Sequence, residues 1–144
     1  MKYYLVLYRI VLYKATPHDT KLALQWAESI CQTDKVVISG FHSPLEKEIL
    51  NYLLDSKHPV IFALGRALYK KVPPHMQSAF DEGRLLFISF RGYSRHSWNS
   101  AQPRNWGIAD LANEVYFTQF DSSSSLSTLH FTLDRYSDIT LHIL

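Results

Sequence analysis

Short apolar runs alternate with segments of helical periodicity along the chain. The apolar runs lie at residues 3–13, 35–39, 59–64, 84–89, 115–120 and 139–143. Because these runs are continuously or almost continuously apolar, they are typical of strands that are covered on both faces. Between them, apolar residues recur at helical spacing at residues 22–30, 45–53, 101–113 and 126–136. The alternation predicts strands joined by helical crossovers, and therefore a mostly parallel sheet.

Two of the predicted helices begin with the same local sequence. Thr16 is followed by proline and, three residues after the cap, by Asp19. Ser43 and Glu46 repeat this spacing around a second proline. The arrangement predicts a capping box, with proline at a position where its missing N–H does no harm. A further short helix is expected after a double proline, and Gly83 can end it in a left-handed conformation.

The chain of 144 residues predicts one Rossmann-like, three-layer α/β domain over residues 1–144, with about six strands in its sheet. Its composition, 47% hydrophobic and 14% aromatic, excludes a disordered segment or a coiled coil. A net charge of +2 is too small to indicate a nucleic-acid-binding protein by itself. The single cysteine, Cys31, excludes an internal disulfide. No apolar run is long enough to span a bilayer, so we expect no membrane association and a cytoplasmic location.

The ends of the predicted strands carry the candidate ligand-binding residues. In an open α/β sheet, ligands bind beyond the carboxyl ends of the strands, where helix N-termini attract phosphate or carboxylate. Residues 40–43 follow the second predicted strand, Arg66 follows the third, and the serine run 122–125 follows the fifth. Each of these residues alone is also typical of a cap or a turn. Several such loops on one edge of the sheet favour an anion-binding site.

The sequence contains none of the motifs that would indicate a particular reaction or cofactor. It lacks the G-x-G-x-x-G dinucleotide fingerprint, the G-x-x-x-x-G-K-[ST] phosphate loop and the G-x-S-x-G elbow of serine hydrolases. Its histidines show no H-E-x-x-H or comparable ligand spacing. We therefore expect no metal, no cofactor and no catalytic residue, and a binding domain rather than an enzyme.

One stretch of the chain carries a resemblance to a known family. Residues 36–48 read VVISGFHSPLEKE, which resembles the V-I-S-G-F-H-S-P-x-E-K-E stretch of DprA/Smf-like proteins, the DNA-processing protein A group. Residues 81–86 resemble its E-E-G-R-L-L segment, residues 103–115 its R-N-R and A-L-A-D-E-V segments, and residues 121–126 its serine-containing loop. The resemblance covers about residues 17–144. It implies a Rossmann-like fold of the LOG/DprA superfamily, and single-stranded DNA as a partner.

The chain also departs from the pattern of that family. Where the family has a G-S-R loop after its first strand, residues 13–17 read YKATP, without glycine. Trp106 replaces the second arginine of R-N-R. The P-G-G-x-G-T-x-x-E motif of LOG hydrolases is absent, and with it the expected catalytic glutamate. The resemblance therefore implies the fold and the place of the site, and not a catalytic activity.

We interpret the chain as a domain that binds a nucleotide-like or phosphate-bearing ligand, with single-stranded DNA as one candidate. The predicted ligand-binding residues are Gly40, Phe41, His42, Ser43, Arg66, Arg104, Asn105, Ser124 and Ser125. Two alternatives stay open: a LOG-like nucleotide hydrolase that uses Glu46 or His42, and a structural domain whose site has decayed. Self-association into a homo-oligomer also stays open.

Overall fold

The computed structural model describes residues 3–7, 16–89, 106–117 and 125–144 of the chain. The strands are β1 (Tyr3–Leu7), β2 (Val36–Ser39), β3 (Val60–Leu64), β4 (Leu85–Ser89), β5 (Glu114–Phe117) and β6 (Thr140–Ile143). The helices are α1 (Pro17–Ile30), α2 (Pro44–Asp55), the 3-10 helix η1 (Pro74–Met76), α3 (Gln77–Asp81) and α5 (Ser125–Tyr136). Residues 106–111 are also helical. The predicted alternation of strands and helices is confirmed over these residues. The remainder of the expected first strand (8–13) and the start of the expected helix at 101–113 lie outside them.

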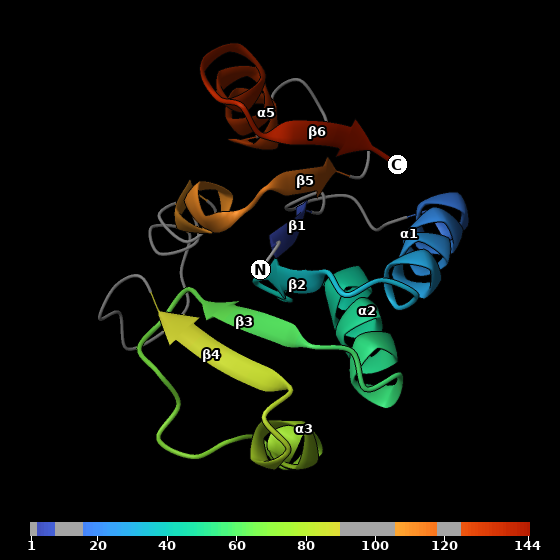
Figure 1. Cartoon of the computed structure of the whole chain (residues 1–144), viewed down its shortest axis with the longest axis vertical. Helices are drawn as coiled ribbons and strands as arrows, with labels where there is room; N and C mark the ends of the chain where they lie inside the picture. The colour runs from blue at the N-terminus through green and yellow to red at the C-terminus, as the bar shows by residue number, and fades with distance from the viewer. Residues whose placement is uncertain (1–2, 8–15, 90–105, 118–124) are drawn as a thin grey trace.

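All strand pairs in the described residues are parallel, in the order β4-β3-β2-β1-β5-β6 (Figure 1). β1 lies between the group β4-β3-β2 and the pair β5-β6, and it pairs with both β2 and β5. The expected α/β class with parallel strands is thus confirmed. From β1 the chain moves outward to β4, and it then returns to the other side of β1. This reversal makes the carboxyl ends of β1 and β5 the topological switch point of the sheet.

The helices cover the sheet on both faces, and each face has its own hydrophobic core. Val37 packs in a cluster with buried residues of α1 and α2, whereas the next residue, Ile38, packs with residues 108–112 and α5. Both side chains are completely buried. Figure 1 shows α1 and α2 on one side of the strands and α5 on the other. This alternation within one strand gives the expected three layers.

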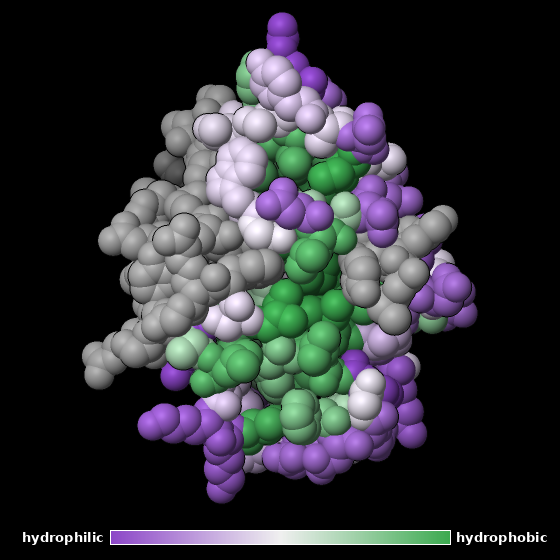
Figure 2. Space-filling view, turned by 60° about the vertical axis from the view of Figure 1, so that its left-hand side comes forward, coloured by the Kyte–Doolittle hydropathy of each residue, from purple (hydrophilic) through white to green (hydrophobic). Residues whose placement is uncertain are grey.

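The strand β4 departs from the expectation of strands buried on both faces. Leu86, its second residue, is 54% exposed, while Leu85 is 4% exposed. β4 is the last strand in the sheet order, so one of its faces is less covered by helices. Other large apolar side chains also contact solvent, among them Leu68 and Phe131. Figure 2 shows one face of the molecule on which apolar residues form a band bordered by hydrophilic ones.

Local sequence sets the helix starts as predicted. The Thr16 hydroxyl accepts the Asp19 N–H at 3.1 Å, and the Asp19 carboxylate accepts the Thr16 N–H at 3.0 Å. Ser43 begins α2 in the same way, so both predicted capping boxes are confirmed. Gly83 follows α3 with a φ of 73°, the left-handed conformation expected from its lack of a side chain. Among the described helices, none is long and apolar enough to cross a membrane.

Candidate functional site

A cleft of about 570 Å³ opens at the carboxyl ends of β2 and β3. It lies between α2 and the segment 65–76, which follows β3 and ends with η1. The lining residues are Gly40, Phe41, His42, Lys47, Leu50, Asn51, Phe62, Leu64, Gly65, Arg66, Tyr69, Pro73, His75 and Met76. The cleft thus uses the edge of the sheet that the sequence predicted for a ligand. It also extends along α2, where no ligand-binding residue was predicted.

The loop after β2 forms one wall and part of the floor. Phe41 has a φ of 43° and is only 2% exposed. Its ring meets the ring of Phe62 edge-on, with centroids 5.3 Å apart. Phe41 therefore contributes an apolar floor, the buried Gly40 also lines the cleft, and His42 is exposed at its surface. Ser43, which was predicted to bind the ligand, does not line the cleft, because its hydroxyl caps α2.

Glu46 lies behind this loop and not in the cleft. Its Oε1 accepts a hydrogen bond from the Ser39 hydroxyl at 3.1 Å, and its Oε2 accepts the Ser43 N–H at 2.8 Å. The residue is 7% exposed. Both carboxylate oxygens are thus engaged inside the protein. The hydrolase alternative that assigned a reaction to Glu46 is not supported, because this carboxylate does not face the cleft.

The loop after β3 forms the opposite wall. The Arg66 carbonyl accepts a hydrogen bond from the Ser89 hydroxyl at 2.6 Å, which ties this loop to the end of β4. The Arg66 guanidinium lies over the ring of Tyr69, with its Cζ 5.0 Å from the ring centroid. Its Nε is buried and has no hydrogen-bond partner among the described residues. An unpartnered buried donor is costly for the folded protein, and the rest of the guanidinium is the part that a ligand in the cleft can reach.

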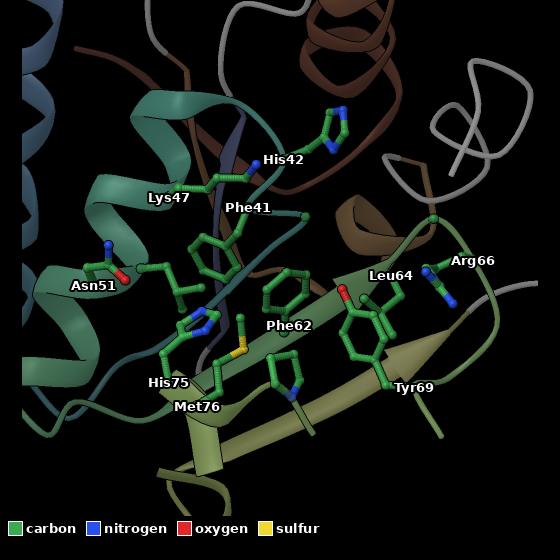
Figure 3. Close-up of a pocket in the computed structure, with 14 residues that line it drawn as sticks. Phe41, His42, Lys47, Asn51, Phe62, Leu64, Arg66, Tyr69, His75 and Met76 are labelled. Carbon is green, nitrogen blue, oxygen red and sulfur yellow. The ribbon is translucent and has the colours of Figure 1, made fainter. Parts of the chain in front are cut away.

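The charged and polar lining residues surround an aromatic floor. Figure 3 shows Lys47 and Asn51 along α2 on one side, Arg66 and Tyr69 on the other, and Phe41 with Phe62 between them. The lining also includes two histidines, at positions 42 and 75. None of the described residues that line the cleft is Asp or Glu. Two fixed positive charges without a nearby lining carboxylate favour an anionic ligand.

The remaining predicted site residues cannot be placed against this cleft. Arg104, Asn105 and Ser124 lie outside the described residues, and Ser125 is the first residue of α5, whose side chain is not described. Their convergence with Gly40 stays a prediction. Sequence reasoning gave no binding role to Lys47, Asn51, Tyr69 or His75. The arginine and two lysines around Tyr69 in the segment 65–76 were a usable signal for that wall.

Two further titratable side chains belong to the fold. His58 is 4% exposed, and its Nε2 lies 2.6 Å from the Lys35 carbonyl oxygen. Burial lowers the pKa of His58, and this hydrogen bond opposes the shift. Burial raises the pKa of the Cys31 thiol, so it is kept protonated rather than activated as a nucleophile. In the described part of the chain, no group of three metal-ligating side chains lies together.

A solved structure with the same architecture comes from Helicobacter pylori. Its DNA processing protein A superposes with a TM-score of 0.70, and the two chains share 16% sequence identity. The match covers 99% of this chain and 64% of the Helicobacter pylori chain. The chain has the fold of DNA processing protein A. The resemblance expected from the sequence is therefore confirmed at the level of the DprA fold.

The Helicobacter pylori structure was described for a single-stranded DNA binding mode. The present chain spans somewhat less than two thirds of that DprA chain. No protein-family model and no curated protein sequence matches the chain. The DprA likeness thus concerns the fold, and the cleft described above provides the independent basis for considering a ligand.

Proposed function

We propose that this DprA-like domain binds single-stranded DNA in the cleft between α2 and the segment 65–76. The observation that carries the proposal is the character of the lining: two cations and two histidines around an aromatic floor, with no lining carboxylate among the described residues. Proteins that bind single strands combine positive charge for the backbone with aromatic surfaces for the bases. Both elements are present in one cleft here.

The chemistry of each wall suits a different part of a nucleotide. A guanidinium donates two parallel N–H groups to a phosphate, and Arg66 lines the wall of the cleft. The Lys47 ammonium adds a point charge on the side of α2. The apolar floor, which Phe41 and Phe62 form, accepts the face of a base. Bases expose their faces only where they are unpaired, so the arrangement favours a single strand over a duplex.

Other parts of the chain complete the proposal. Arg104 and Asn105 would contact phosphate or base, and Ser124 with Ser125 would close the site from the loop before α5. Self-association would join two clefts and extend the positive surface available to one strand. A sedimentation experiment with and without oligonucleotide measures that association directly.

Binding is tested with the full chain by fluorescence anisotropy of a labelled oligothymidine and of a duplex of the same length. We expect the single strand to bind more tightly, with an affinity that falls as salt rises, because phosphate contacts release counterions. The variant Lys47→Ala/Arg66→Ala should lose about tenfold or more, the effect of one charged hydrogen bond. The matched control is Lys21→Ala/Arg135→Ala, which removes the same two residue types from the exposed surfaces of α1 and α5.

Two outcomes would contradict the proposal. Equal losses in the cleft variant and in the control would show that only net charge matters. Equal affinity for the duplex would remove the role of unpaired bases.

A small nucleotide is the second candidate ligand, because the volume of the cleft is typical of small-molecule sites. Thermal shift with mononucleotides separates the two candidates. Saturable stabilisation by a mononucleotide, together with full competition against the oligonucleotide, would favour the small ligand.

A further inference from the structure

The Glu46 carboxylate joins the end of β2 to the start of α2 across the loop that lines the cleft. Ser39, the last residue of β2, donates its hydroxyl to Oε1 at 3.1 Å. Ser43, the cap of α2, donates its N–H to Oε2 at 2.8 Å. Ser39 is completely buried and Glu46 is 7% exposed. The three residues of the cleft loop, 40–42, lie between these two attachment points.

Helix capping alone does not account for both bonds. A capping box needs one carboxylate oxygen, which accepts the N–H of the cap residue. The second oxygen of Glu46 is bonded instead to a strand residue that precedes the helix by several positions. Within the described ranges, Glu46 also forms no ion pair with Lys or Arg. A buried carboxylate without a cation is costly to maintain, so its two hydrogen bonds and the N-terminal end of α2 have to stabilise it.

The loop that Glu46 spans has a strained backbone. Phe41 is a non-glycine residue with a φ of 43°, in the left-handed region that disfavours residues with a Cβ. Such a conformation persists where the surrounding structure holds it. Here both ends of the loop are attached to the same carboxylate, and the Phe41 ring is packed against Phe62. The strained turn directs Phe41 into the floor and leaves His42 exposed at the cleft surface.

We propose that Glu46 is a positioning residue for the ligand-binding loop, which it holds by coupling the end of β2 to the start of α2. The proposal rests on the proposed function of the cleft. For the effect of removing Glu46 on ligand affinity, it predicts the opposite of what charge alone predicts. Removing a negative charge near an anion site should strengthen binding of a phosphate backbone. Removing Glu46 should instead weaken it, because the loop loses its two attachments.

The first experiment compares three variants of the full chain by oligothymidine anisotropy, at a temperature where circular dichroism shows each to be folded. Glu46→Ala should lower affinity about tenfold, as expected when a charged hydrogen bond no longer maintains the binding geometry. Glu48→Ala removes the same charge from an exposed position on α2 and should bind as the wild type does or more tightly. Glu46→Gln should restore binding, because its amide accepts the Ser43 N–H and donates to the Ser39 oxygen.

The second experiment removes only the attachment to the strand. Ser39→Ala leaves the Ser43–Glu46 capping box intact, and amide hydrogen exchange by NMR reports on the loop without any ligand. We expect faster exchange at residues 40–42 and unchanged exchange in the first turn of α2.

If Glu46→Ala binds oligothymidine with the affinity of the wild type, the positioning role is overturned. The same holds if Glu46→Gln does not restore the affinity that Glu46→Ala loses. Unchanged exchange in Ser39→Ala does so as well. If the wild type itself binds no oligonucleotide, the proposed function fails, and the exchange result alone decides the role of Glu46.

Discussion

Replacing Arg66 by lysine separates the geometry of the cleft from its charge. The substitution keeps one positive charge at the end of β3 and removes the planar guanidinium with its Nε–H. In the wild type, this Nε is buried without a hydrogen-bond partner among the described residues. Leaving such a donor unsatisfied costs about 1–3 kcal/mol in the free protein. The lysine variant lacks that donor, so we expect its stability to be equal to the wild type or higher.

The expected loss of binding follows from the guanidinium as a whole, which lines the cleft. A hydrogen bond to a charged group contributes about 1.5–3 kcal/mol, which corresponds to roughly ten- to 150-fold in affinity. The position of the guanidinium over Tyr69, at 5.0 Å, adds orientation that the flexible lysine does not keep. Arg66→Lys should therefore weaken oligonucleotide binding by at least about tenfold, although the net charge is unchanged.

The assay measures oligothymidine affinity and thermal unfolding on the same preparations. Lys47→Arg serves as the matched control, because it exchanges the same two residue types on the other wall. Binding by Arg66→Lys within a factor of about two of the wild type would refute recognition by the guanidinium. A clear fall in melting temperature would instead assign Arg66 a structural role in the loop after β3.

Three further predictions concern stability and the residues outside the described part of the site. Gly83→Ala should destabilise the protein by about 1–2 kcal/mol in urea unfolding, because Gly83 has a φ of 73° although no atom lies within 4 Å of an added Cβ. Burial lowers the pKa of His58 below 6.5, so its contribution to stability is complete above that pH and is lost as pH falls toward the lowered pKa. In urea unfolding, the free energy of unfolding of the wild type should accordingly fall as pH drops below 6.5. The variant His58→Gln should show a smaller fall over the same pH range. Arg104→Lys should weaken ligand binding roughly ten- to a hundredfold without a change in melting temperature.

Much of the fold was predictable because the signals are local. A capping box depends only on two residues that are three positions apart, and the left-handed turn at Gly83 depends only on the absence of a side chain there. The buried strand β2 is readable from its continuous apolar sequence. Leu86 was misjudged because exposure of an edge strand depends on which helices cover it, and this is a property of the whole sheet.

The site was less predictable because its walls come from segments that are brought together only by the tertiary structure. Lys47 and Asn51 belong to the cleft only because the segment 65–76 packs opposite one side of α2. Phe41 was expected to bind the ligand as part of the loop 40–43, but with its left-handed φ the ring packs into the floor of the cleft and is only 2% exposed. The bond between Ser39 and Glu46 joins residues that no local rule pairs.

The position of β1 has a consequence for synthesis of the protein. One side of this first strand pairs with β2, but the other side receives β5, with Tyr4 opposite Glu114. At ribosomal speeds of about 5–20 residues per second, roughly 6–20 s pass between emergence of the two strands. During that interval β1 can form a sheet with β2, β3 and β4 while its other edge still exposes unpaired N–H and C=O groups, the feature by which strands recruit other chains. Nascent chains stalled before residue 114 should therefore be a preferred client of chaperones that cover open sheet edges.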